Sequence, residues 1–357
     1  MSGKLRSGFS TGACSAAAAK AAATALCTGT CPEHVDLSFP NGQIHRFLVH
    51  SCRKEEGRAF ASVIKEAGDD PDITHHAEIC ASIGKGHIQD EAVCVFDDNV
   101  QLIRGSGVGV VTKPGLSVAV GEPAINPVPR KMIYAAIRSV TEDAVNVTIS
   151  IVNGETLAEK TLNKRLGILG GLSVLGTTGI VRPVSAAAWI ATISTCMDVA
   201  RRAGLTEIVL STGRTSERGA QDYLDLPEEA YAMMGDYLAF SLKTAARKGF
   251  ATIHYAGMWA KLMKAALQIP QTHVRNGALE IAAAAELLNE LGAQPPLTER
   301  LKDSNTAREM LGHIQDTGQT FLIEAVCHKA KAYAEEVSGS AVKIYLIDNN
   351  AKVIAHA

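Results

Sequence analysis

The residues best suited to hold a ligand lie in the run GILGGLSVLGTTGIVRP at positions 167–183, where glycines alternate with aliphatic and hydroxyl residues. Glycine costs about 0.5–1 kcal/mol in a regular element, so such a cluster is typical of a loop that approaches another group closely. Its serine and threonine hydroxyls supply donors without bulk, as recognition of an adenosyl group or a carboxylate requires. The run therefore predicts a nucleotide-like ligand site. A tight packing crossover is the alternative interpretation.

A second loop of small residues, at positions 211–214, follows a short β-rich segment at 207–210. Between the two loops, residues 186–203 have helical spacing, and Gly204 predicts where that helix ends. Loop, helix, strand and loop in this order are typical of an α/β ligand site. Neither loop has the residue order of a Walker motif or of a GxGxxG motif.

Basic residues beside glycines and prolines indicate an anion site. The passage from Gly105 to Gly115 is rich in glycine, and the segment NPVPRK at 126–131 places Arg130 and Lys131 at the start of a predicted helix. Positive charge opposes the helix dipole there, which favours a bound anion. A solvated first turn is the alternative. The segment GFSTG at 8–12 leads into an alanine-rich helix predicted at 13–26, capped by Ser10 or Thr11, whose first amides attract carboxylate or phosphate.

An acidic turn, GDDPDIT at 68–74, is followed by His75 and His76. Asp70 and Asp72 are the predicted catalytic residues, because a carboxylate covered by a substrate can act as a general base. Carboxylates that flank a proline more often form a capped turn, so no metal site is predicted. Spacing alone does not choose between these roles.

Length and patterning predict two domains, since 357 residues exceed what one hydrophobic core usually holds. Residues 1–155 alternate strands at 35–39, 44–50 and 59–65 as an antiparallel meander, followed by further strands and a helix at 130–140. Residues 156–357 show longer helices between short strands. The predicted fold is an α+β N-terminal domain with a small-residue helix, followed by an α/β domain with the glycine-rich loop. One elaborate domain is the alternative.

Composition excludes several classes of protein. The formal net charge of -2 provides no basic field for nucleic acid. No apolar stretch reaches the roughly 18 residues of a membrane span, so we expect a cytoplasmic protein with no membrane partner. The cysteines form no CxxC pairs, and neither a GxSxG elbow nor a Cys-His pair predicts covalent acyl transfer. A homo-oligomer remains possible.

Six segments in a fixed order then point to a family: STGACSAAAAKAA, GDDPDIT, GVGVVTKPGL, GEPAINPVPRKMI, NKRLGILGGLSVLGTTGIVRPVS and THVRNGALE. The chain resembles the cobalt-precorrin-5B carbon-1 methyltransferase family of anaerobic cobalamin biosynthesis, from Arg6 to about Leu291. The resemblance implies S-adenosylmethionine as the methyl donor and a cobalt-corrinoid precursor as the acceptor, giving cobalt-precorrin-6A. It differs from the family at positions 10–12, 211–214 and 256–261, which affects details of binding more than the class of reaction.

The implied reaction suggests roles for the candidate residues, with the donor site assigned from the order of loop, helix, strand and loop and the acceptor contacts from the carboxylates of the acceptor. The predicted donor (cofactor) residues are Gly170, Gly171, Ser173, Gly176, Thr177, Thr178, Gly179, Thr212 and Gly213. The predicted acceptor (substrate) residues are Ser10, Thr11, Gly12, Lys113, Asn126, Arg130, Lys131 and Arg182. Two other functions are compatible with the residues, a tetrapyrrole-binding carrier and a small-molecule kinase. The kinase would need magnesium ligands, and the acidic turn offers the only candidates.

Overall fold

The computed structural model describes residues 5–88, 93–97, 99–272 and 279–357, and the chain divides into two compact units, Met1–Ser185 and Ala186–Ala357. The first unit is α+β and the second is α/β, the fold class predicted from the sequence. The division falls after Ser185, whereas the sequence predicted it after residue 155. The intervening segment pairs with the first unit: β11 (Ile168–Leu169) with β9 (Val110–Val111), and β12 (Ile180–Val181) with β1 (Gly8–Phe9).

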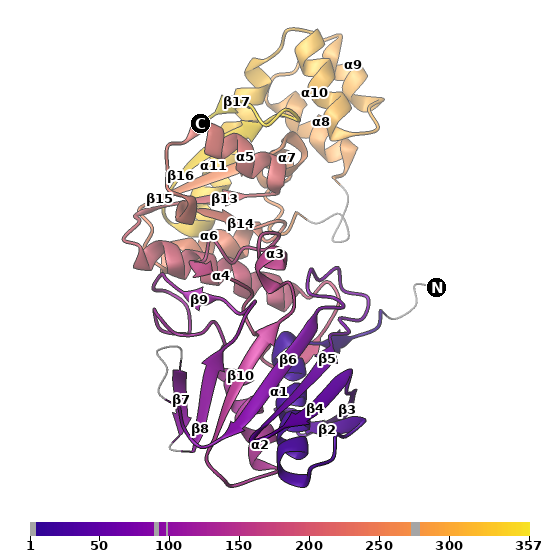
Figure 1. Ribbon diagram of the computed structural model, residues 1–357. Coiled ribbons are helices and arrows are strands. Elements are labelled where there is room, and N and C mark those ends of the chain that lie inside the picture. Colours follow the sequence, from indigo (N-terminus) through magenta and orange to yellow (C-terminus); the bar gives the residue numbers. More distant parts are fainter. Residues whose placement is uncertain (1–4, 89–92, 98, 273–278) are drawn as a thin grey trace. The chain divides into compact units, whose positions relative to one another are not determined.

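The first unit is built on a six-stranded sheet of order β4-β5-β6-β10-β8-β7 (Figure 1). Its strands are β4 (Ser51–Glu55), β5 (Arg58–Ile64), β6 (Glu78–Lys85), β7 (Val93–Asp97), β8 (Val100–Arg104) and β10 (Val145–Ile151). Neighbouring strands are antiparallel except β8 and β10, which are parallel.

The predicted meander is wrong in one respect. The first two predicted strands, β2 (His34–Ser38) and β3 (Ile44–Leu48), form a sheet of their own, and β5 pairs instead with β4. Strand β4 escaped prediction because its sequence, SCRKE, is an exposed polar edge without apolar alternation. Arg53 in β4 lies over the ring of Phe60 in β5, 4.1 Å from its centroid.

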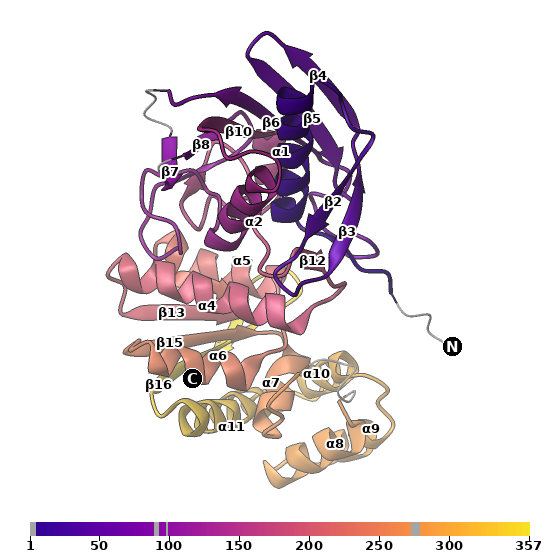
Figure 2. The same cartoon turned by 90° about the horizontal axis from the view of Figure 1, so that it is seen from below.

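Helix α1 (Thr11–Thr28) packs against β5, β6 and α2 (Pro127–Arg138), and Figure 2 shows α1 and α2 side by side. Nearly all of its residues are buried alanines or other small residues, which let neighbouring backbones approach closely. The helix begins as predicted at a Ser10 cap, whose hydroxyl accepts from the Ala13 amide at 3.2 Å. A short helix, α3 (Gly154–Ala158), follows β10.

The second unit is built on a five-stranded sheet of order β14-β13-β15-β16-β17. Its strands are β13 (Glu207–Ser211), β14 (Tyr231–Met233), β15 (Thr252–Gly257), β16 (Ala341–Ile347) and β17 (Val353–His356). The first four are parallel and β17 is antiparallel. The chain moves from β13 to β14 on one side and then to β15 on the other, so the direction of winding reverses between β13 and β15. Right-handed crossovers therefore place α5 and α6 on opposite faces of the sheet.

The helices of the second unit are α4 (Ala186–Arg202), α5 (Arg214–Tyr223), α6 (Leu238–Arg247), α7 (Trp259–Ala266), α8 (Ile281–Glu290), α9 (Leu297–Lys302), α10 (Ala307–Asp316) and α11 (Phe321–Ser338), with a 3-10 turn at Glu228–Ala230. The helical spacing of residues 298–315 predicts a single helix there, but Thr306 caps a new helix by accepting from the Glu309 amide at 3.1 Å. Helix α5 escaped prediction because its sequence is almost wholly polar. No helix within the described ranges is long and apolar enough to cross a bilayer.

A buried histidine in this sheet gives a pH prediction. His254 is 2% exposed and lies between Glu207, 2.6 Å from its Nε2, and the Tyr345 hydroxyl, 3.0 Å from its Nδ1. Burial lowers the pKa of His254 below its ordinary value, and the neighbouring Glu207 only partly offsets this.

Because the pKa of His254 is lower in the folded unit, the unfolded chain binds a proton at this residue more readily. The contribution of His254 to stability is therefore full above about pH 6.5 and falls as the pH drops below it. The melting temperature, measured between about pH 5 and 7, should fall as the pH is lowered through the ordinary pKa of histidine. The His254→Gln variant should flatten this decrease, and an unchanged slope in that variant would assign the dependence to another group.

Candidate functional site

A cavity of about 630 Å³ lies over the carboxyl ends of β13, β15 and β16 in the second unit. Its walls come from the loop after β13, the loop after β15, the turn after β16 and one side of α10. The lining residues include Thr212, Gly213, Arg214, Ser216, Met258, Trp259, Lys261, Arg308, Gly312 and Asp348. Open α/β sheets bind ligands at this edge, where the direction of winding reverses. The volume lies within the roughly 300–1,000 Å³ of sites for small molecules.

Two helices begin at this cavity without a side-chain cap. Helix α5 follows Gly213, which has no side chain to offer, and the Ser216 hydroxyl accepts from the Gly213 amide at 3.0 Å. Helix α7 follows Met258, which makes no side-chain cap bond either. The first amides of both helices are thus open to an anionic or polar group.

Trp259 lies in the first turn of α7 and lines the cavity. The residue is 4% exposed, and its indole Nε1 is buried with no hydrogen-bond partner among the described residues. A buried donor without a partner is costly, and this cost is borne by the wall of the cavity.

Charged groups surround the cavity. Asp348 follows β16 directly, and its Oδ1 accepts from the amides of Asn350 at 2.9 Å and Lys352 at 2.7 Å, which fixes the orientation of the carboxylate. The Lys261 ammonium pairs with Asp236. Arg308 donates to the Asn349 side chain at 2.6 Å, and Arg214 is exposed at the start of α5. The cavity therefore offers cations and helix amides on one side and a held carboxylate on another.

A smaller cavity of about 330 Å³ shares Ala260 and Lys261 with the first and includes Lys264. Lys264 is buried, and burial together with the nearby charge of Lys261 lowers its pKa below the ordinary value. Its ammonium donates to the Thr272 carbonyl at 3.0 Å. The sequence pattern also predicts a strand at 272–275. Beyond Thr272 this stretch and part of the segment THVRNGALE lie outside the described residues.

The glycine-rich run lies in the first unit and packs against its own chain. The Gly12 amide donates to the Leu175 carbonyl at 3.0 Å, and the Thr11 hydroxyl accepts from the Leu175 amide at 2.9 Å. A Cβ at Gly176 would lie 2.4 Å from the Ser10 hydroxyl oxygen. The run therefore covers the N-terminus of α1, and Ser10, Thr11 and Gly12 of that helix start make the packing contacts with it.

Other glycines of the run also lie where neighbouring groups leave no room for a side chain. A Cβ at Gly171 would lie 2.4 Å from the Gly107 backbone, and one at Gly179 would lie 2.7 Å from the Phe39 ring. Gly170, Thr177 and Thr178 are exposed, while the Ser173 hydroxyl reaches Asn163 at 3.4 Å. The predicted donor residues are thus divided between the units, because Thr212 and Gly213 line the cavity of the second.

Some predicted acceptor residues of the first unit make contacts within that unit, and others are exposed. The Arg130 guanidinium donates to the Ile125 carbonyl at 2.6 Å and to Glu122 at 2.8 Å, which holds the loop before α2. The Asn126 amide donates to the Val174 carbonyl at 2.9 Å, and the Lys113 side chain covers Gly167. Lys131 and Arg182 are exposed.

The predicted catalytic carboxylates both have partners. Asp70 accepts from the Val184 amide at 2.9 Å. Asp72 accepts from the Lys65 ammonium at 2.6 Å and from the Thr74 amide and hydroxyl at 2.7 and 2.6 Å. Burial raises the pKa of Asp72, but the charge of Lys65 and the hydrogen bonds outweigh it and leave the pKa below its ordinary value. A carboxylate held in this way is a weak proton acceptor, so its contacts weigh against a role as base.

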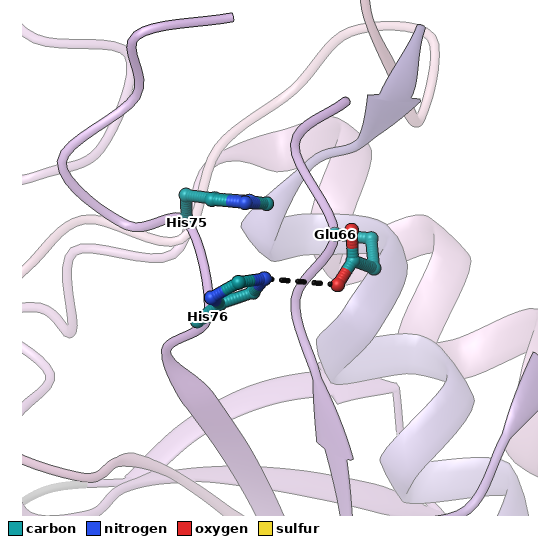
Figure 3. Close-up of side chains that lie close together, drawn as sticks. All are labelled: Glu66, His75 and His76. Atoms are coloured by element: carbon teal, nitrogen blue, oxygen red, sulfur yellow. Dashed lines mark ion pairs between the residues drawn. The ribbon is translucent and has the colours of Figure 1, made fainter. Parts of the chain in front are cut away.

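Within the described residues, Glu66, His75 and His76 place potential metal ligands within 4.8 Å of one another (Figure 3). His76 Nε2 lies 3.1 Å from the Glu66 carboxylate. The Ala67 amide donates to His75 Nδ1 at 3.0 Å, so a neutral His75 carries its proton on Nε2. Neither ring nitrogen of His75 then offers a free lone pair, and the group is better explained as a contact between His76 and Glu66 beside the tilted ring of His75.

Several cavity residues were not predicted, among them Arg308, Gly312 and Asp348. The turn after β16 was detectable, because the apolar run at 342–347 predicts a strand and ligands bind beyond the carboxyl ends of parallel strands. Arg308 and Gly312 gave no signal, since only the packing of α10 brings them to the sheet edge.

The fold and cavity define a two-domain protein whose α/β unit has a cavity of small-molecule size where the winding of its sheet reverses. A sequence model of the CbiD family matches residues 1–183, and one of the CbiD C-terminal domain matches residues 271–357. The chain belongs to the CbiD family.

Named relatives match almost the whole chain. A cobalt-precorrin-5B C(1)-methyltransferase of Desulfotalea psychrophila is 58% identical over 98% of this chain and 97% of its own length. One from Geobacter metallireducens is 44% identical over 98% of both chains. A solved structure titled cobalamin biosynthesis protein (cbiD), from Archaeoglobus fulgidus, is 25% identical with a TM-score of 0.40, covering 72% of this chain and 78% of that one.

Proposed function

We propose that this protein transfers a methyl group from S-adenosylmethionine to carbon 1 of cobalt-precorrin-5B, giving cobalt-precorrin-6A. The observation that carries the proposal is the 58% identity, over nearly the full length of both chains, to a relative named for methylation at that carbon. The cavity of the second unit supports it, because a methyltransferase needs a site of small-molecule size for its donor.

The reaction asks little covalent chemistry of the protein. An electron-rich macrocycle carbon attacks the sulfonium methyl, the electron pair of the broken carbon–sulfur bond passes to sulfur, and the macrocycle loses one proton. Alignment of two bound reactants can be worth about 7–11 kcal/mol. Glycines, hydroxyls and cations therefore suffice, without a protein nucleophile.

The acceptor carries carboxylates, and charge-assisted bonds from lysine and arginine would hold them. Lys131 and Arg182 are the exposed members of the predicted acceptor set, whereas Arg130 is engaged with its own loop. Lys131 and Arg182 are thus the best candidates for direct contact.

Turnover tests the proposal. Incubating the full chain with S-adenosylmethionine and cobalt-precorrin-5B should increase the mass of the pigment by one methyl group in place of hydrogen, with S-adenosylhomocysteine formed in equal amount. Pigment that is bound but unchanged in mass would identify a carrier and refute the proposal. Omitting the donor is the matched control.

A further inference from the structure

We propose that the cavity over the carboxyl ends of β13, β15 and β16 is the methyl-donor site, with the donor's amino-acid carboxylate at the start of α5 and its ribose hydroxyls at Asp348. The inference rests on the proposed function and assigns the donor to the second unit. It leaves the glycine-rich run of the first unit with a packing role.

Size and position favour the donor over the acceptor as the occupant. A volume of about 630 Å³ suits a nucleoside amino acid, whereas a tetrapyrrole with its acid side chains is considerably larger. The cavity also lies beyond the carboxyl ends of β13 and β15, the neighbouring strands between which the direction of winding reverses. Doubly wound sheets bind nucleosides at this point.

The carboxylate end is placed by α5. This helix of ten residues starts at Arg214 with no side-chain cap at Gly213, so its first amides and the Arg214 guanidinium can meet one carboxylate together. The second, independent observation is the cavity itself, whose wall includes Thr212, Gly213 and Arg214 at this helix start.

The ribose end is placed by Asp348. Two backbone amides hold its Oδ1, and within the described chain Oδ2 has no hydrogen-bond partner. A carboxylate held at the end of a parallel strand is the group that binds ribose hydroxyls in nucleoside-binding sheets. Met258, Leu311, Ile347 and Ile354 supply the apolar wall for the adenine base.

Two glycines allow the cavity to be filled without disturbing the fold. A Cβ at Gly213 or at Gly312 would meet nothing within 4 Å, Gly213 has an extended backbone with φ 173, and Gly312 is helical. The Gly312→Leu and Gly213→Val variants should fold normally, and leucine should even favour helix α10. Ala332→Leu adds the same side chain at an exposed position of α11 and is the matched control.

Calorimetric titration of the full chain with S-adenosylhomocysteine tests the site. We expect binding at least tenfold weaker in Gly312→Leu and Gly213→Val, with melting temperatures and the Ala332→Leu affinity unchanged. Affinities within twofold of the wild type in both cavity variants would overturn the inference. Loss of acceptor binding alone would also overturn it, by assigning the cavity to the corrinoid.

The orientation is tested with a second probe, methylthioadenosine, which lacks the amino-acid carboxylate. Arg214→Ala should weaken binding of S-adenosylhomocysteine but not of methylthioadenosine, and Asp348→Asn should weaken both. The reverse pattern would overturn the orientation.

The test of the donor site is separate from that of the proposed function. If the cavity variants lose binding of the nucleoside while the wild type never methylates the pigment, only the proposed function fails. If the wild type methylates and the cavity variants keep full affinity, only the inference fails.

Discussion

Replacing Asp72 with asparagine should lower the free energy of unfolding of the first unit by about 3–5 kcal/mol, because it leaves the Lys65 ammonium buried without a counter-charge. Lys65 is 1% exposed, and Asp72 is its ion-pair partner at 2.6 Å. Asparagine keeps the shape and its oxygen can still accept from Thr74, but its NH2 group then faces the ammonium, so the loss includes the Lys65 hydrogen bond as well as the charge. Chemical denaturation, followed by hydrogen exchange of amides in the first unit, would report it.

The double variant Asp72→Leu with Lys65→Met is the matched control. Removing both charges should restore most of the stability, since apolar pairs often replace buried ion pairs at little cost. The difference between the wild type and Asp72→Asn should shrink as the pH falls below about 4, because the folded pKa of Asp72 lies below its unfolded value and protonation removes the charge.

The same variant also tests the predicted catalytic role. If Asp72 were the general base, Asp72→Asn would abolish methylation under conditions where the unit stays folded and would change stability little. A stability loss as large as expected, with activity retained at low temperature, assigns the residue to the fold.

Replacing Gly171 with alanine should destabilise the first unit by about 2–5 kcal/mol, from a strained backbone and a clash that cannot relax easily. Gly171 has φ +154, and its Cβ would lie 2.4 Å from the Gly107 carbonyl. The obstacle is backbone, which gives way less readily than the end of a flexible side chain. Urea denaturation should show the transition of the first unit at lower denaturant concentration.

Gly170→Ala is the neighbouring control. Its φ is +75, but the nearest atom to a Cβ is Arg104 Nη1 at 3.8 Å, so only the left-handed backbone cost of about 1–2 kcal/mol remains. Equal effects at the two positions would contradict the packing explanation. Normal stability in Gly171→Ala together with lost donor binding would support the ligand role that the sequence predicted for the run.

Glycine spacing illustrates why a sequence pattern can be detected without its purpose being known. Bare backbone signals close approach to something, but the approaching group is decided by the fold. At Gly171 and Gly176 the approaching groups are Gly107 and Ser10, residues far away in the sequence. At Gly213 the missing side chain leaves open space instead. Pattern alone treats these glycines alike.

Local chemistry by itself determined the parts of this protein with strong periodicity or caps: α1 with its Ser10 cap, strands β5, β10 and β13, and the change from α+β to α/β along the chain. It also determined the family, because ordered motifs need no coordinates to be matched. Tertiary structure alone decided that α10 and the turn after β16 meet the loops of β13 and β15, and that Arg130 and Asp72 have partners within the first unit. The reason is physical: helix and strand propensities depend on neighbours a few residues away, whereas a cavity or an ion pair depends on groups that only long-range packing brings together.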